Sequence, residues 1–349
     1  MIQFGTVKSA VRAAEDLTGV IVAHLNPRYW SHDSNDENAA DLRDYVVGVA
    51  HGVASNLRSL AVHRSKYAET RYAHDHQAGM LLTETGKPYP TPGDRRSGRY
   101  HERAAELVAY EQAFFVTLGA VLDCLATLVA GLSGLRTNVI RCDLAAVGLP
   151  TSHVESYPDS SSRAMKLLAT GKGELRDRQI AALRSLAVSI DQAGNPGWLR
   201  WAIDMRNTLV HREHRNTCIT FERSPKLGTR FYYLPPKDPS ETQMRALRDS
   251  QDNLSDYYLM EDVGSLMIGL EESISASTIG AIEALSGVRS WRLRNPGSWA
   301  DPSDQWKPGS SGGNFVGYGN AVSRTVFRNA SLHMNPRDAQ RLRAASVGN

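Results

Sequence analysis

The stretch of sequence that decides the fold is Glu102–Gly134, which reads ERAAELVAYEQAFFVTLGAVLDCLATLVAGLSG. Its large apolar side chains recur every three or four residues, at Leu107, Tyr110, Phe114, Leu118, Val121, Leu125, Leu128 and Leu132. The helical period of about 3.6 residues places these side chains on one face, and Gly131 and Gly134 favour a helix end. The sequence therefore predicts a long core helix over residues 102–134.

The segments on either side predict a mainly α-helical protein. Apolar residues at helical spacing predict a helix over 37–82, which begins at the capping run Asn35–Asn38 and ends before the proline-rich turn Gly86–Gly93. Further helices are predicted over 161–170, 174–192, 197–214 and 239–286. Two short runs, 218–221 and 230–234, are rich in β-branched and aromatic residues and predict a β-hairpin.

This pattern divides the chain into three regions. Residues 1–95 form an N-terminal helical region, which is either a separate unit or extra helices packed on the same core. Residues 96–286 form the main helical domain. Residues 287–349 form a basic, tryptophan-containing and partly irregular segment that includes the glycine–serine run Gly309–Gly313.

The charge of the chain is nearly balanced but unevenly distributed. Forty Lys and Arg face 37 Asp and Glu, for a net charge of +3, which excludes a uniformly basic RNA-coating protein. Residues 289–349 alone carry +6, so the first 288 residues sum to −3. In the first part of this segment the tryptophans are interleaved with basic residues: Trp291, Trp299 and Trp306 with Arg289, Arg292, Arg294 and Lys307. The segment therefore either contacts single-stranded RNA or anchors itself on the helical core through its indoles.

Cysteine use and hydropathy predict a soluble, cytoplasmic protein. The three cysteines show no spacing that suggests disulfides or a zinc site. The N-terminus has no apolar signal core. No run reaches the about 18 consecutive apolar residues of a membrane span, because Thr117, Asp123 and Thr127 interrupt the longest stretch. We expect no membrane partner and no cofactor.

The most informative short motif is Arg206–His211, RNTLVH. An arginine followed by a polar residue and, four to six positions on, a histidine, late in a helical region, resembles the R-x(4–6)-H motif of HEPN ribonucleases. The order of the helices over about residues 100–215 is similar to that of these proteins as well. The resemblance implies an antiparallel helical bundle, here with additional N-terminal helices and a short β-hairpin after the motif helix.

Helix geometry predicts how the motif residues are directed. Trp198, Ala202, Met205 and Leu209 fall on one stripe, which should pack into the bundle. Five residues turn through about 140° net, so Arg206 and His211 do not leave the helix in the same direction. HEPN nucleases build their cleft from two protomers, and the same arrangement would bring these two side chain types together here. We therefore expect a homodimer.

By resemblance, His211 is the acid/base residue, Arg206 the phosphate clamp and Asn207 a positioning residue. Cleavage of RNA without a metal needs a base for the ribose 2′-OH, an acid for the leaving 5′-oxygen and a cation for the phosphorane. These residue types supply all three. The expected products are a 2′,3′-cyclic phosphate or 3′-phosphate and a 5′-OH.

Other residues are expected in supporting roles. Glu111 and Asp123 interrupt the apolar face of the 102–134 helix, and the resemblance implies that one of these two carboxylates orients Arg206. The candidate RNA-binding residues are Arg200, Arg212, His214, Arg292 and Arg294. No metal site is expected, since His211 and His214 lack carboxylate or thiolate neighbours at ligand spacing. Glu213 stands where related toxins often carry a tyrosine that an antitoxin modifies, so that form of control is not expected.

Two classes of function remain open from the sequence. The first is a metal-independent endoribonuclease that acts as a toxin or antiphage-defence effector, with RNA as substrate and an antitoxin or defence-system protein as a possible partner. The second is a non-catalytic helical module that binds RNA or a protein partner, including a scaffolding or toxin-neutralising subunit. The non-functional interpretation of the motif is that Arg206 caps a helix or forms a salt bridge, and that His211 is a solvated histidine near a helix C-terminus, where a cation is favoured.

Overall fold

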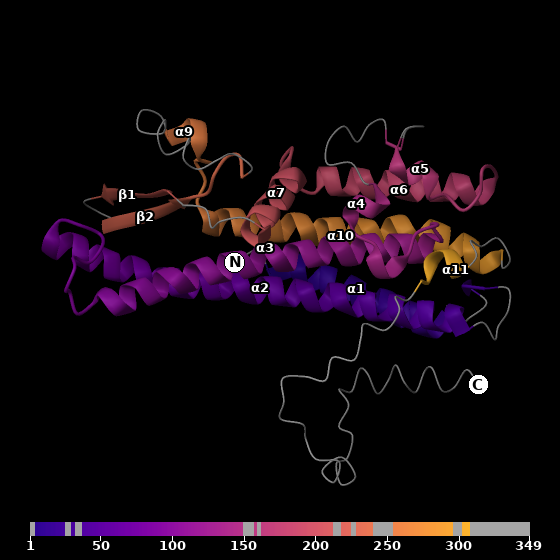
Figure 1. Cartoon of the computed structure of the whole chain (residues 1–349), viewed down its shortest axis with the longest axis horizontal. Coiled ribbons are helices and arrows are strands. Elements are labelled where there is room, and N and C mark those ends of the chain that lie inside the picture. The colour runs from indigo at the N-terminus through magenta and orange to yellow at the C-terminus, as the bar shows by residue number, and fades with distance from the viewer. Residues whose placement is uncertain are drawn as a thin grey trace, which may run out of the picture.

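The chain is mainly α-helical, with one small two-stranded antiparallel sheet (Figure 1). The computed structural model describes residues 4–24, 29–31, 37–148, 157–158, 162–211, 218–224, 228–239, 254–295 and 302–307. The longer helices are α1 (Phe4–His24), α2 (Glu37–Thr85), α3 (Ser97–Ser133), α6 (Glu174–Gln192), α7 (Trp198–His211) and α10 (Val263–Arg294). The short elements are η2 (Val139–Arg141), α4 (Leu144–Val147), α5 (Arg163–Lys166), β1 (Cys218–Ser224), β2 (Gly228–Leu234), α9 (Leu254–Tyr257) and α11 (Pro302–Gln305).

The apolar stretch that predicts the core helix forms α3, which begins five residues earlier than expected, at Ser97. The helix ends where Gly134 adopts a left-handed conformation with φ of 69°, which a residue without a Cβ adopts at little cost. Gly131 does not end the helix. It lies within the last turn, where the absence of a side chain lets Val46 of α2 approach closely.

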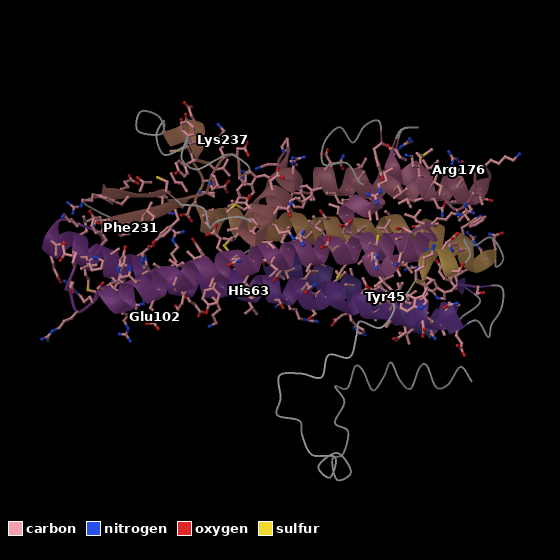
Figure 2. All side chains as sticks on the ribbon, in the orientation of Figure 1. Tyr45, His63, Glu102, Arg176, Phe231 and Lys237 are labelled. Carbon is pink, nitrogen blue, oxygen red and sulfur yellow. The ribbon has the colours of Figure 1, made fainter. Side chains whose placement is uncertain are left out.

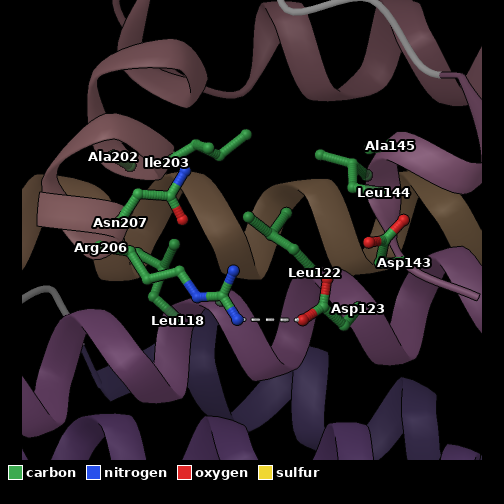
Figure 3. Close-up of a pocket in the computed structure, with 11 residues that line it drawn as sticks. Leu118, Leu122, Asp123, Asp143, Leu144, Ala145, Ala202, Ile203, Arg206 and Asn207 are labelled. Atoms are coloured by element: carbon green, nitrogen blue, oxygen red, sulfur yellow. Dashed lines mark hydrogen bonds and ion pairs between the residues drawn. The ribbon is translucent and has the colours of Figure 1, made fainter. Parts of the chain in front are cut away.

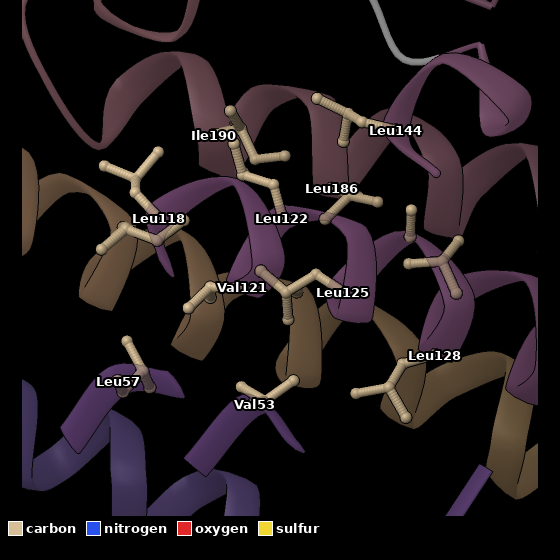
Figure 4. Close-up of a cluster of buried hydrophobic side chains, with 14 of the residues drawn as sticks. Val53, Leu57, Leu118, Val121, Leu122, Leu125, Leu128, Leu144, Leu186 and Ile190 are labelled. Atoms are coloured by element: carbon tan, nitrogen blue, oxygen red, sulfur yellow. The ribbon is translucent and has the colours of Figure 1, made fainter. Parts of the chain in front are cut away.

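The long helices pack side by side along the molecule (Figure 1). α2 lies against α3, α1 packs on α2 and α10, and α6 packs on α10. α7 crosses α3 on the side away from α2 (Figure 1). One continuous core runs from Val7 in α1 to Trp291 in α10, with leucines and valines of α2, α3 and α6 at its centre (Figure 4). The N-terminal helices thus share the core of the rest of the chain.

Several predicted boundaries are confirmed and others are wrong. The predicted helices over 37–82 and 174–192 match α2 and α6, and the predicted hairpin is β1–β2, paired from Cys218 with Leu234 to Ser224 with Gly228. The expected helix over 161–170 is a single turn, α5. The predicted helix end at 286 is also wrong, because α10 continues to Arg294.

The predicted continuous helix over 239–286 is wrong as well. In the part that the structure describes, one turn (α9) is followed by extended chain, where Tyr258 pairs with Pro236. The helix starts again only after Asp262, whose side chain accepts a hydrogen bond from the Gly264 N–H as an N-cap. A capping aspartate with an extended backbone thus divides a stretch whose apolar periodicity favours helix throughout.

A buried polar network attaches the hairpin to α2 and α10. Arg71 of α2 pairs with Asp262 and Asp75 and donates to the carbonyl of Phe231 on β2. Tyr233 of β2 donates its hydroxyl to Asp75 at 3.0 Å, and its oxygen lies 2.7 Å from His74 Nδ1. The side chain of His74 is buried. Figure 2 labels Phe231 on the hairpin and Lys237 just after it.

Three elements converge on the C-terminal end of α3. Arg292 of α10 is 1% exposed and donates to the carbonyls of Gly131, Leu132 and Tyr29. Gln179 of α6 donates to the carbonyls of Ser133 and Gly134, and Gln305 of α11 to those of Ala130 and Leu135. The last carbonyls of a helix have no donors within the helix. Here these side chains supply donors to them, in addition to the Gly134 and Leu135 N–H groups, which donate to the carbonyls of Gly131 and Ala130.

By length and composition α3 is apolar enough to cross a membrane, contrary to the expectation from the sequence. Its most apolar 18-residue window has a mean hydropathy of 2.1, but 67% of that window is buried within the protein. A core helix of a water-soluble protein has the same properties, and the burial is consistent with that class.

Candidate functional site

The motif helix α7 is fixed by its buried stripe. Trp198, Ala202, Met205 and Leu209 are all buried, as their spacing predicts. The helix begins after Gly197, whose φ is 83°, and the Trp198 N–H donates to the Asn195 carbonyl. Near the other end, the Gln112 side chain of α3 donates to the carbonyl of Leu209 at 3.2 Å. Packing and capping therefore set both the rotation and the position of α7 relative to α3.

Arg206 crosses α3 at a glycine. A Cβ placed on Gly119 would lie 2.5 Å from Nε and 2.8 Å from Cδ of Arg206, closer than real Cβ contacts. The guanidinium therefore occupies space that every other residue type at position 119 would fill. Beyond the glycine, Nη2 of Arg206 lies 3.5 Å from Oδ2 of Asp123, one helical turn further along α3 (Figure 3).

A cavity of about 330 Å³ opens beside this pair (Figure 3). Its polar lining consists of Arg206 and Asn207 of α7, Asp123 of α3 and Asp143, which precedes α4. Its remaining walls are small or aliphatic residues of the same three helices: Leu118, Gly119, Leu122, Leu144, Ala145, Ala202 and Ile203. The cavity thus brings a cation, an amide and two carboxylates together against apolar walls.

The guanidinium of Arg206 has few partners. Its Nε is buried and finds no hydrogen-bond acceptor among the described residues. The one ion pair that it makes among the described residues, with Asp123, is long, and the two side chains are 35% and 36% exposed. A guanidinium carries five N–H donors in a planar fork, so most of this donor capacity is open to a ligand that enters the cavity.

The two carboxylates differ in what holds them. Asp143 accepts a hydrogen bond from the Ala146 N–H at 2.6 Å and so caps α4. Burial raises the pKa of Asp123, and the nearby Asp143 raises it further while Arg206 lowers it. With both acids ionised, the described polar lining has a formal charge of −1. The cavity alone is therefore not a general anion-binding site.

Only part of the predicted set of residues meets at this site. Arg206, Asn207 and Asp123 line one cavity. Glu111 does not join them: it is 5% exposed and lies two turns before Gly119 on α3, where its charge adds to the effect of burial in raising the pKa of Tyr67 of α2. Burial raises the pKa of Glu111 to about 7. Of the two carboxylates considered, Asp123 is thus the one that contacts Arg206.

The predicted RNA-binding residues are scattered. Arg200 is exposed on α7 and pairs with Asp204 at 2.6 Å, outside the cavity. The expectation for Arg292 is wrong, because its guanidinium is buried at the end of α3 and is not available to RNA. Arg294, two residues on, is exposed and donates to the Ser290 carbonyl.

Some predicted residues lie outside the described part of the chain. His211 is the last residue of α7, but its side chain is not among the described parts of the structure. Arg212 and His214 also lie outside the described residues, as does Glu213. No group of three or more His, Cys, Asp or Glu residues that could hold a metal ion is found within the described ranges.

Sequence reasoning missed two residues of the cavity. Gly119 interrupts an apolar helix, and a glycine there often marks a close approach by another group, which could have been recognised. Asp143 precedes Leu144–Val147 as a typical N-cap, but nothing in the sequence places that cap beside Asp123.

Comparisons with protein-family models, with curated proteins and with solved structures found no match.

Proposed function

We propose that this chain is a metal-independent endoribonuclease of the HEPN type, with Arg206 as its phosphate clamp. The observation that supports this most is the guanidinium of Arg206, which has a single long ion pair and a buried Nε without an acceptor among the described residues, beside a cavity that Asn207 also lines. Guanidinium donors bind phosphate oxygens in pairs and can stabilise the charge of a phosphorane.

Each remaining residue has a role in this proposal. Asp123 holds the guanidinium over Gly119, and the carboxamide of Asn207, the neighbour of Arg206 on α7, positions the phosphate. His211 takes the proton of the 2′-OH and gives a proton to the leaving 5′-oxygen, for which an imidazole with a pKa near neutrality is suited. The products are a 2′,3′-cyclic phosphate, or a 3′-phosphate after its hydrolysis, and a 5′-OH.

The proposal includes a second copy of the chain. On a regular helix, Arg206 and His211 differ in direction by about 140°, so one α7 does not aim both side chains at one phosphate. The described polar lining of one cavity has a formal charge of −1, which repels a polyanion. Two α7 helices related by a two-fold axis would add the cations of the sequence His211–Arg215 to the cleft. The role proposed from the resemblance is that of a cytoplasmic toxin or defence effector.

Cleavage assays on point variants test the proposal. The wild-type protein should cut single-stranded RNA in EDTA, and Arg206→Ala should reduce the rate by about 10²–10³-fold, the usual effect of losing one group that stabilises transition-state charge. His211→Ala should do the same. Arg178→Ala is the matched control, since Arg178 is an exposed arginine of α6 paired only with Glu174 among the interactions described. Equal rates for Arg206→Ala and Arg178→Ala contradict the assignment.

The charge of the cavity favours one alternative. Asp123 and Asp143 stand beside the single guanidinium, an arrangement that also suits a protein or RNA ligand offering N–H donors. A non-catalytic HEPN-like module would therefore bind its partner here without cutting. Binding of RNA or of a partner protein that Arg206→Ala weakens, together with no cleavage by the wild type in either EDTA or Mg²⁺, would establish this second function in place of the first.

A further inference from the structure

A second cavity, of about 480 Å³, lies at the start of α7. It is bounded by the turn between α6 and α7 on one side and by the first half of α10 on the other. It shares no lining residue with the cavity beside Arg206. Its volume lies within the range of about 300–1,000 Å³ that is typical of sites for small ligands.

Two indoles with fixed orientations line this cavity. Trp198 donates its indole N–H to the carbonyl of Ile190 at 2.9 Å, and Trp201 donates its own to the carbonyl of Pro236 at 3.1 Å. Trp201 also packs against Phe115 of α3 with ring centroids 5.8 Å apart. Because each indole uses its only donor elsewhere, the rings offer a ligand in the cavity their π-systems and no hydrogen bond.

The charged side chains that line this cavity are acidic. Glu261 lies just before α10 and Glu272 on its third turn, and no Lys, Arg or His is found among the described residues that line the cavity. The start of α7 offsets this charge only in part, since two amides there are already bonded: the Trp198 and Trp201 N–H groups donate to the carbonyls of Asn195 and Gly197. The cavity therefore combines aromatic walls with a negative charge.

We propose that this cavity binds an organic cation, through a guanidinium or alkylammonium group. Such a group is attracted to the π-face of an indole by the ring quadrupole and to a carboxylate by its charge, and aromatic walls with acidic residues at the rim are how proteins bind such cations. An inorganic anion is disfavoured by the two glutamates. The same cationic chemistry occurs in free polyamines and in the side chain of an arginine in a peptide.

Calorimetric titration of the full-length protein with agmatine tests the proposal. The double variant Glu261→Gln and Glu272→Gln keeps the size of both side chains and should weaken agmatine binding at least tenfold. Glu283→Gln, an exposed carboxylate later on α10 that does not line the cavity, removes a charge without touching the site and should leave the affinity unchanged. The indole ¹⁵N–H signals of Trp198 and Trp201 should shift on titration, and those of the other four tryptophans of the chain should not.

Two further titrations, with Nα-acetylarginine amide and with inorganic phosphate, identify the source of the cation and test whether the cavity selects for positive charge. Binding of Nα-acetylarginine amide at least as tight as that of agmatine points to an arginine of a peptide, and tighter binding of agmatine points to a free polyamine. Three outcomes overturn the proposal: no heat from either cation, equal agmatine affinity in the wild type and the double variant, or shifts of the same two indole signals with inorganic phosphate. None of these results depends on whether the protein cuts RNA.

Discussion

Replacing Gly119 with alanine displaces Arg206 without altering any charge. The added Cβ would lie 2.5 Å from Nε of Arg206, whereas ordinary contact begins at 3.4 Å, so the guanidinium must move by at least 0.9 Å, the difference of the two distances. The group in the way is the far end of a flexible side chain, and it can leave by changing rotamer. That movement takes the guanidinium away from Asp123 and from the cavity. A phosphate bound in the cavity would then lose its contact with Arg206.

The stability of the fold should change little. Alanine is favoured over glycine inside a helix by about 1 kcal/mol, and a strained arginine rotamer costs about 0.5–1.5 kcal/mol, so the two effects nearly cancel. Gly287→Ala is the matched control: Gly287 lies inside α10 with nothing within 4 Å of its added Cβ. This control should gain about 1 kcal/mol in the free energy of unfolding, with unchanged activity.

Two measurements check the effect of Gly119→Ala. RNA cleavage in EDTA should fall at least tenfold, toward the rate of Arg206→Ala. Independently of activity, the pKa of Asp123, followed by carboxyl ¹³C shifts, should rise above its wild-type value, because Arg206 lowers that pKa in the wild type. Wild-type cleavage by Gly119→Ala, together with loss of cleavage in Arg206→Ala, would refute the idea that the position of Arg206 against α3 is the active one.

Three further substitutions test the supporting structure. Arg292→Met removes the donor that the carbonyls of Gly131, Leu132 and Tyr29 share, and should lower the free energy of unfolding in urea by about 1–3 kcal/mol, whereas the exposed Arg294→Met should change it by less than about 0.5 kcal/mol. Burial raises the pKa of Glu111 from 4.5 to about 7, so the folded protein holds a proton that the unfolded chain releases, and stability falls as pH rises through that interval. Glu111→Gln should remove that decline and be more stable than the wild type at pH 8, by up to about 3 kcal/mol; parallel pH profiles would contradict it. Tyr233→Phe removes the hydroxyl between His74 and Asp75 and should cost about 1–3 kcal/mol, measured by the same denaturation.

Periodicity was sufficient to predict the helices that carry the core. The apolar spacing of residues 102–134 and 37–82 predicts α3 and α2, since a buried stripe at helical spacing is stable only as a helix packed on another. The same reasoning predicts the buried stripe of α7. It fails for 254–262, where the capping side chain of Asp262 and a pairing between Tyr258 and Pro236 outweigh the helical pattern.

The cavity beside Arg206 was predictable only in part. The sequence identifies Asp123 as a charge on an apolar helix, and a charge at such a position needs a partner. It does not show that Gly119 lets the partner reach it, because that depends on where α7 crosses α3. Arg292 shows the opposite failure: a basic run near the end of the chain predicts an exposed arginine, but this one is buried and donates to carbonyls at the end of α3.

The way α3 is completed has a consequence for the order in which the chain folds. Its last carbonyls receive donors from Gln179, Arg292 and Gln305, which lie about 45, 160 and 170 residues further along the sequence. During synthesis the N-terminal two fifths of the protein can therefore form its helices, but the C-terminal end of α3 does not yet have these side-chain donors. Chains released before residue 292 should be recognised by proteases at the segment after Ser133, and the finished protein should resist cleavage there.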